Sequence, residues 1–419
     1  MKLSQAFTTA IAGTALVVLG ACSSEDLGTS ANTSASPAAS NNVLSSESLV
    51  QAMGSETPLG LGCGWIAASD PDKANIAFPD SEAKYWVAAA PVSPQTRLRI
   101  DGRYPDARYF SYNAYDAALR PTDAVADFEL APNDKGRAGN PFARKGAKPG
   151  GSYTAYLEYG ASPIQNPGTV RKPNTFYTGE IGLGPVNIPN ALAVFIYRVY
   201  VSNTGEFFDG GVGLPTLTLE TADGSRELGT LPNCVEPLMP NLGGTAPPLG
   251  LNELLLGLDY PNQLTLPFPT ATNPPNTLKF FSLGDTAFRI LGNVTGQDTS
   301  MVGGRIDSGS GGFLSNVHNA YTSTGFARQY GNIAMVRAKA PTYRGQPGVE
   351  FGQEQLRYWS LCGNEFATQR FTDCAADFQV PLDEQGFFTV VISDPADRPA
   401  NATAENGFLW LPWGPYPDQ

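Results

Sequence analysis

The strongest constraint on the fold of this chain is an internal repeat. Residues 108–111 (Arg-Tyr-Phe-Ser) recur as residues 357–360 (Arg-Tyr-Trp-Ser), and an aspartate follows 19 or 20 residues after each arginine, as Asp127 and Asp377. Three further blocks match in the same order, namely residues 78–85 with 314–321, residues 100–105 with 336–341, and residues 151–157 with 386–392. Five ordered matches indicate a duplicated unit, so we expect one fold to occur twice.

Each repeat has the sequence pattern of antiparallel β structure. Apolar side chains alternate at a period of two in residues 153–157 and again in 388–392, with turn-forming clusters between such segments. The 45 Gly and 35 Pro, together with 17 Tyr and 22 Phe, favour many turns joining aromatic-rich strands. Residues 192–201 form the clearest predicted strand, and residues 408–411 take the equivalent place in the second copy. The predicted fold class is all-β, with two tandem, internally duplicated, jelly-roll-like antiparallel β-sandwiches.

The first residues have the form of a bacterial lipoprotein signal. The apolar run over residues 7–21, which follows Lys2, is too short for the ~20 apolar residues of a membrane-spanning helix but suits a signal-peptide core. It ends in a lipobox, residues 19–22 (Leu-Gly-Ala-Cys), which predicts cleavage before Cys22 and lipidation of that cysteine. An ordinary secreted protein cleaved elsewhere is the alternative.

The predicted anchor places the protein in the cell envelope. Ser23 stands where the sorting pattern of Gram-negative lipoproteins would have Asp for retention, so the pattern predicts the outer membrane. In a Gram-positive cell the anchor would lie on the outer face of the plasma membrane. The predicted partner is thus a membrane, reached through Cys22.

Composition divides the rest of the chain into segments. Residues 28–42 consist entirely of Gly, Ala, Ser, Thr, Asn and Pro, a composition that cannot bury a core and is typical of a flexible tether. A Pro-rich stretch near the middle reads as a linker or crossover, in which residues 252–256 predict one short helix with Asn252 as its N-cap. The expected organisation is a signal peptide at 1–21, a tether at 22–55, a first β-sandwich at 56–235, a linker at 236–277 and a second β-sandwich at 278–419.

The cysteines fit an exported protein. Removing Cys22 from the five leaves Cys63, Cys234, Cys362 and Cys374, an even number in an oxidising compartment. Three pairings are possible, of which we favour Cys362–Cys374 and Cys63–Cys234. No CxxC spacing occurs and the chain has a single His, so the sequence predicts disulfides and neither a metal site nor a cofactor.

The formal net charge of −12 restricts the classes of partner. Nucleic acid and anionic lipid surfaces reward clustered Lys and Arg, so this balance disfavours both, and we expect no nucleic-acid partner.

The blocks around Arg108 and Arg357, together with residues 398–401 and 410–414, resemble families of uncharacterised bacterial envelope proteins. The resemblance covers most of residues 78–215 and 313–419. It implies β-sandwich domains of unknown function and no activity.

A search for catalytic motifs finds almost none. A Ser-His-Asp mechanism would have to use His318, near Ser308, Ser310 and Ser315, but the chain lacks a GxSxG elbow. The Gly-rich segment at 303–312 lacks the Lys-Ser/Thr of a phosphate loop. Acid pairs are assembled by the fold, so a carboxylate-pair hydrolase stays open.

The candidate ligand-binding side chains are aromatic or polar residues of the second copy. They are His318, Asn319, Tyr321, Trp359, Trp410 and Trp413. Aromatic residues at strand spacing are also typical of a core, and His318 is also expected in a polar turn.

The recurrent charges predict a structural bridge in each copy. We expect Arg108 to pair with Asp127, and Arg357 with Asp377, between neighbouring strands. Ligand-binding charge pairs are the alternative.

Two functional hypotheses follow. The first is a non-enzymatic lipoprotein that binds a small molecule, a lipid or an envelope protein, with an apolar ligand requiring an enclosed apolar pocket. The second is a hydrolase of a glycan or polymer, using a carboxylate pair or a serine with His318.

Overall fold

The computed structural model describes residues 63–69, 80–116, 121–134, 139–183, 186–190, 192–203, 209–234, 278–280, 316–323, 331–364 and 371–414. The chain from Gly64 to Gln419 forms one compact unit. Within it, residues 64–234 are called the first half and residues 278–414 the second half. Within the described ranges, no helix is both long and apolar enough to cross a membrane. The predicted signal peptide, tether, linker and short helix at 252–256 lie outside the described residues.

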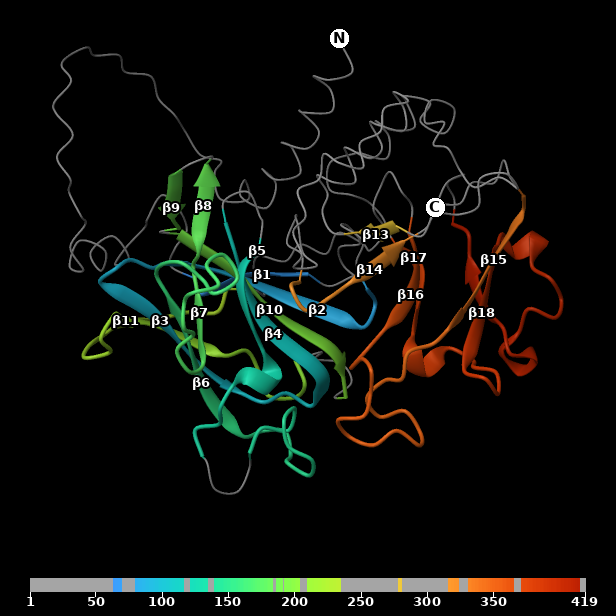
Figure 1. Ribbon diagram of the computed structural model, residues 1–419, viewed down its shortest axis with the longest axis horizontal. Helices are drawn as coiled ribbons and strands as arrows, with labels where there is room; N and C mark the ends of the chain where they lie inside the picture. Colours follow the sequence, from blue (N-terminus) through green and yellow to red (C-terminus); the bar gives the residue numbers. More distant parts are fainter. Residues whose placement is uncertain are drawn as a thin grey trace, which may run out of the picture. The chain divides into compact units, whose positions relative to one another are not determined.

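The first half contains two five-stranded sheets (Figure 1). One has the order β1-β2-β10-β4-β5, and all its neighbours are antiparallel. Its central strand β10 confirms the strand predicted at 192–201. The strands are β1 (Trp65–Ser69), β2 (Ala83–Pro91), β10 (Leu192–Ser202), β4 (Ala107–Tyr115) and β5 (Pro121–Ala126).

The second sheet has the order β12-β11-β3-β6-β7. Its neighbours are antiparallel except β6 and β7, which are parallel. The side chains of β3 alternate between buried and half-buried, as the period of two predicts. The elements are β12 (Glu227–Leu231), β11 (Thr216–Thr221), β3 (Thr96–Arg103), β6 (Ser152–Glu158) and β7 (Thr175–Tyr177), with a separate hairpin of β8 (Glu180–Leu183) and β9 (Val186–Pro189) and the 3-10 helix η1 (Asp127–Glu129).

Aromatic side chains fill the space between these two sheets. Tyr112 of β4 and Tyr153 of β6 are fully buried, and their hydroxyls share a hydrogen bond of 2.7 Å. The ring of Tyr112 also stacks on Phe176 of β7, with centroids 5.7 Å apart. These contacts join the inner faces of both sheets, and the paired hydroxyls satisfy polar groups that would otherwise be costly to bury.

The second half is also β structure, in smaller sheets. A three-stranded sheet has the order β15-β18-β19, and two hairpins pair β16 with β17 and β13 with β14. The described chain is therefore mostly β, as the composition predicts. The elements are β13 (Leu278–Phe280), β14 (Tyr321–Ser323), β15 (Ile333–Lys339), β16 (Ser360–Asn364), β17 (Phe371–Ala376), η4 (Asp377–Gln379), β18 (Phe387–Ser393), η5 (Pro395–Asp397), η6 (Ala404–Asn406) and β19 (Leu409–Pro412).

A separate hydrophobic cluster holds the second half together. Val390 of β18, Leu411 of β19 and Ala375 of β17 are buried in it, and Trp359 and Leu361 pack against it half-buried. The three-stranded sheet and the β16–β17 hairpin therefore share one core.

The last strand does not match the position predicted for it. We expected residues 408–411 to correspond to residues 192–201, the strand that closes the first copy. Instead β19 pairs in parallel with β18, as β7 pairs in parallel with β6. It therefore corresponds to β7, and its short alternating sequence could not reveal a parallel neighbour.

All four described cysteines are disulfide-bonded, as predicted. Cys362 of β16 lies directly opposite Cys374 of β17 and is bonded to it. Beside Cys63 and Cys234, the amide of Gly64 donates to the Pro232 carbonyl at 2.7 Å. Disulfides form and persist in oxidising compartments, which indicates an extracytoplasmic location.

Candidate functional site

Two arginine–aspartate ion pairs join the first half to the second. Arg108 of β4 binds Asp377 of η4, with 2.5 Å between Nη1 and Oδ1, and Arg357 binds Asp127 of η1 in the same way. The predicted pairing inside each repeat, Arg108 with Asp127 and Arg357 with Asp377, is therefore wrong. In the sequence, one aspartate follows each arginine after 19 or 20 residues. This spacing does not show whether an arginine binds the aspartate of its own half or that of the other half.

Each of these aspartates is also bound by its own half. Asp127 accepts a hydrogen bond from the Phe110 amide at 3.0 Å, and Asp377 accepts one from the Trp359 amide at 3.2 Å. Both carboxylates are fully buried. Burial raises the pKa of Asp127 to about 6 and also raises that of Asp377, although the facing arginine lowers each.

Aromatic rings cover both arginines. The guanidinium of Arg108 lies 5.1 Å from the ring centre of Phe378, and that of Arg357 lies 5.3 Å from that of Phe128. Each phenylalanine directly follows one of the two aspartates. The aspartate therefore binds the arginine through its charge, and the next residue does so through its ring face.

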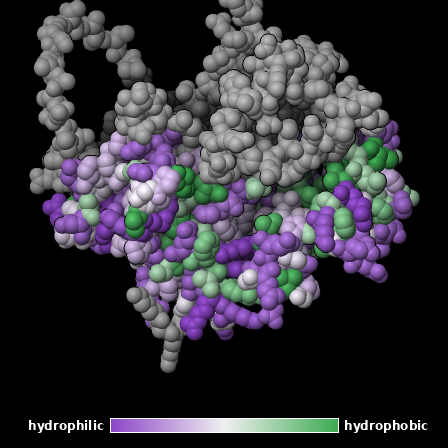
Figure 2. Space-filling model, viewed as in Figure 1, coloured by the Kyte–Doolittle hydropathy of each residue, from purple (hydrophilic) through white to green (hydrophobic). Residues whose placement is uncertain are grey.

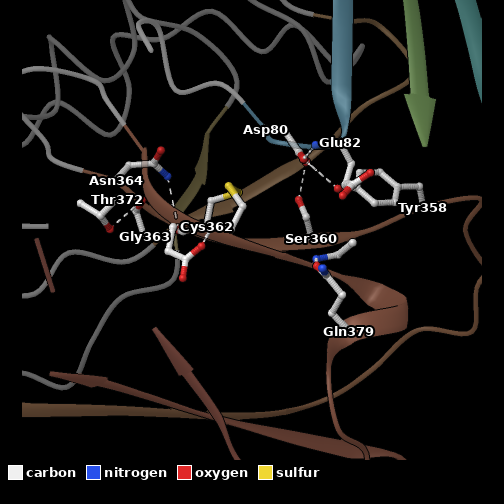
Figure 3. The surroundings of a disulfide bond; sticks show 12 residues. Asp80, Glu82, Tyr358, Ser360, Cys362, Gly363, Asn364, Thr372 and Gln379 are labelled. Atoms are coloured by element: carbon white, nitrogen blue, oxygen red, sulfur yellow. Dashed lines mark hydrogen bonds between the residues drawn. A yellow bond between two sulfur atoms is a disulfide. The ribbon is translucent and has the colours of Figure 1, made fainter. Parts of the chain in front are cut away.

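A second set of contacts lies where the chain enters β2. Asp80 accepts hydrogen bonds from the Tyr358 hydroxyl at 2.8 and 2.9 Å and from the Ser360 hydroxyl at 2.5 Å (Figure 3). The pKa of Tyr358 is raised, first by burial and then by the charge of Asp80, so the phenol stays protonated and donates. These bonds again cross between the halves.

A matching contact runs from the first half to the second, with a tyrosine of the first half as the donor. The Tyr109 hydroxyl donates to Asn316 at 3.3 Å and lies 3.2 Å from Nδ1 of His318. The turns are alike, since the His318 amide donates to Asn316 just as the Glu82 amide donates to Asp80. We call the two ion pairs, the two tyrosine contacts and their partners the seam.

Four tyrosines and the imidazole form one cluster within the seam. The ring of Tyr200 lies 5.3 Å from Tyr109, 6.0 Å from Tyr85 and 5.9 Å from Tyr358. His318 lies 6.3 Å from Tyr109 and is itself exposed. Tyr200 is buried, whereas the other three tyrosines are half-buried. Rings that carry hydroxyls can both stack on a ligand and form hydrogen bonds with it.

The predicted tryptophans lie elsewhere. Trp413 is 1% exposed and belongs to the core of the second half. Trp359 stacks on Phe388 beside that core, and Trp410 donates from its indole nitrogen to the Ser393 hydroxyl. Trp413 and Trp359 therefore take the core role that strand spacing favours, and none of the contacts described for the three tryptophans is with His318.

The two remaining candidates follow His318 in the chain. Asn319 is half-buried, and its amide closes the turn by donating to the Asn316 carbonyl at 3.1 Å. Tyr321 begins β14.

Three potential metal-ligating atoms come together beside the seam. An oxygen of Asp80 and the sulfurs of Cys362 and Cys374 lie within 4.8 Å of one another, and among the described residues no other such group occurs. Both sulfurs belong to the disulfide, so neither is a thiolate, the form that binds metals (Figure 3).

Sequence reasoning missed the residues that receive the tyrosine hydroxyls. Asp80 and Asn316 occupy matching positions in the repeat blocks, but neither is among the candidate residues that the sequence offers. The signal that could have found them is that both copies have a polar residue at this position and a tyrosine in the Arg-Tyr block, namely Tyr109 and Tyr358. Polar groups that become buried need hydrogen-bond partners, so these two positions were candidates for a contact.

No protein family and no curated protein matches the chain. The structure is similar to that of an uncharacterised protein from Burkholderia cenocepacia, with 14% sequence identity, a TM-score of 0.42, and coverage of 85% of this chain and 76% of that one. It is also similar to a structural-genomics target from Vibrio parahaemolyticus, with 10% identity, a TM-score of 0.34, and coverage of 81% and 83%. The chain is thus structurally similar to uncharacterised bacterial proteins.

Proposed function

We propose that this protein is a lipid-anchored, non-enzymatic binding protein of the bacterial envelope that holds its ligand at the seam. The observation that carries this proposal is the cluster of His318 with four tyrosines, to which both halves contribute. A site assembled from two units of one chain is a common place for a ligand.

The anchoring part of the proposal rests on the lipobox and the tether-like composition after Cys22. The disulfides support it, because they require an oxidising compartment. Cys22→Ala should abolish incorporation of labelled palmitate and release the protein from the membrane fraction.

We also infer that the halves are two copies of one jelly-roll-like β-sandwich unit. Matching strand registers support this inference. Ile100 of β3 opposes Ala155 of β6, and Val336 of β15 opposes Val390 of β18, at positions that the repeat blocks align. Copies of one unit can meet through the same surface on each, as the exchanged ion pairs do.

The chemistry of the cluster suggests a ligand whose rings can stack on tyrosine and which also carries hydroxyl groups. Trp359 and Trp413, two of the predicted ligand-binding residues, pack with the second-half core. At the seam, half-buried tyrosine rings stand beside amide, imidazole and hydroxyl groups, which suits a glycan of the envelope.

The hydrolase alternative needs a base and a nucleophile in contact. The contacts described for His318 are with Tyr109 and Asn316, whereas Ser308, Ser310 and Ser315 lie outside the described residues. No observation at the seam therefore favours a serine mechanism over binding.

Isothermal titration calorimetry of the protein with soluble envelope oligosaccharides tests the proposal. His318→Ala and Tyr109→Phe should weaken binding at least severalfold, because they remove groups that face the ligand. Glu405→Ala, an exposed residue of η6, serves as the control and should bind normally. Unchanged binding in both seam variants would contradict the site. Release of new reducing ends that stops in His318→Ala would instead establish the hydrolase.

A further inference from the structure

A basic segment stands out on this acidic chain. Residues 139–150 carry Arg144, Lys145 and Lys148, all exposed, and contain no Asp or Glu, although the whole chain has a net charge of −12. Arg103, at the end of β3, joins them because its Nε donates to the Gly150 carbonyl at 2.9 Å. Figure 2 shows mainly hydrophilic residues along the lower edge of this face, where the segment lies. We call these four side chains the basic ledge.

The backbone beneath the basic ledge is fixed by buried contacts. The side-chain amide of Asn140 donates to the carbonyls of Asp127 and Leu130 at 2.6 and 2.8 Å. Phe142 is buried against Tyr104, with ring centroids 6.3 Å apart. Three of the four charges are therefore held on one ordered segment, and Arg103 is bound to its end through Gly150, which lowers the entropy lost when they bind a partner.

Three of the four charges, those of Arg103, Arg144 and Lys148, form no ion pair among the described residues. The fourth, Lys145, contacts Glu350 at 3.5 Å, with both side chains about 70% exposed. A pair so exposed contributes little and exchanges readily with another anion. The basic ledge is therefore available to an anionic partner.

An apolar side chain lies beside the segment that carries these charges, since the Arg357 guanidinium contacts both Phe128 and Phe142 of that segment. Phe128 of η1 is 51% exposed, and its neighbour Asp127 provides one of the carbonyls that hold Asn140. Exposed aromatic rings beside Lys and Arg are typical of surfaces that rest at the level of lipid headgroups.

We propose that the basic ledge and Phe128 dock on the anionic headgroups of the membrane that carries the Cys22 anchor, an inference that rests on the proposed lipid anchor. Lys and Arg bind headgroup phosphates through charge, and the phenylalanine ring enters the interface. Cys22 lies 41 residues before Cys63, so the proposed anchor would keep the body at high local concentration near the bilayer. This favours a lipid surface over a soluble polyanion.

The docking also accounts for an acidic protein approaching an anionic surface. A net charge of −12 repels such a membrane as a whole, but charges beyond a Debye length of ~8 Å are screened at physiological salt. Only the face nearest the bilayer then determines the interaction. There the ledge contributes four positive charges, against the exposed carboxylates of Glu129 beside Phe128 and of Glu350 beside Lys145.

Flotation of the full chain carrying Cys22→Ala tests this docking without the acyl anchor. Vesicles of equal parts phosphatidylcholine and phosphatidylglycerol should bind the protein, whereas phosphatidylcholine alone should not. The double substitution Arg144→Gln with Lys148→Gln should lower binding about tenfold or more. Lys172→Gln with Lys339→Gln removes the same charge from exposed positions elsewhere and should have little effect.

Absence of binding to the anionic vesicles, or an equal loss in both double variants, would overturn the docking. Binding that persists at high salt would also count against it, because screening removes charge contacts of this kind. All four substituted side chains are exposed, so unchanged thermal unfolding of each variant excludes misfolding as the cause. Failure of the lipid anchor would appear separately, as missing palmitate on the unsubstituted protein.

Discussion

The two halves of the molecule share the register of one hairpin and the 3-10 helix that follows it, but they differ in the size of their sheets and in their cross-links. In both, an arginine-bearing segment leads to a hairpin with the same register, since Ser111 opposes Ala126 in β4–β5 and Ser360 opposes Ala376 in β16–β17. In both, the aspartate that follows that hairpin begins a 3-10 helix. The local sequence therefore determines the strand plan in each half.

The difference lies in how each half is stabilised. The first half has two five-stranded sheets with fully buried aromatic residues, whereas the described sheets of the second half have three and two strands. At the position where Asn113 opposes Ala124 in the first half, the second half has the Cys362–Cys374 disulfide. A smaller core needs such cross-links, so we infer that the second half depends more on the disulfide and on the seam.

The largest expected effect comes from removing one arginine of the seam. Arg357→Ala leaves Asp127 buried beside the Phe110 amide without its cation, which should lower the free energy of unfolding by about 2–4 kcal/mol. Urea unfolding followed by circular dichroism measures this loss. Lys145→Ala, which removes an exposed contact between the halves, is the control and should cost under about 0.5 kcal/mol.

A double-mutant cycle tests the exchange of partners directly. Arg108→Ala combined with Asp377→Asn should show a coupling energy of about 1–3 kcal/mol, because the two side chains are in contact. The same arginine variant combined with Asp127→Asn should be nearly additive. A larger coupling within the first half would restore the pairing predicted from the sequence.

An effect of similar size concerns the disulfide. Cys362→Ala with Cys374→Ala opens a loop with a sequence separation of 12, which in the chain-entropy model costs roughly 3 kcal/mol. Thermal unfolding should therefore shift to lower temperature, by more than for Asn113→Ala, which has no cross-link to lose. Equal shifts for both changes would show that the second half does not depend on its cross-link.

The sequence predicts those features of this fold that depend on neighbours along the chain. Alternation in residues 192–201 became β10, and proximity in sequence correctly paired Cys362 with Cys374. It could not predict β19 as the parallel neighbour of β18, because a short strand has the same alternation whichever direction its partner runs.

The candidate site was less predictable because its residues come from distant segments. His318 was identified as the single imidazole, but its contact with Tyr109 spans 209 residues. Trp413 had the residue type of a ligand-binding surface and lies in the core, since strand periodicity alone does not state which face is buried. The matching blocks of the sequence indicate Tyr109 and Tyr358, and only the structure shows that each donates to a residue of the other half.

The smallest expected effect is a dependence of stability on pH that compares the two buried aspartates. Burial raises the pKa of Asp127 to about 6, above the value near 3.9 of an unfolded aspartate. The folded state therefore holds more protons between these values, and the free energy of unfolding contributed by Asp127 falls as pH rises from about 4 to about 6, by about 2 kcal/mol. The difference in unfolding free energy between the unsubstituted protein and Asp127→Asn, measured at pH 4 and at pH 7, should show this fall.

Burial also raises the pKa of Asp377, so Asp377→Asn should change the profile with the same sign. A profile that is unchanged in both variants, or that changes with opposite signs, would show that the two ends of the seam are not electrostatically alike.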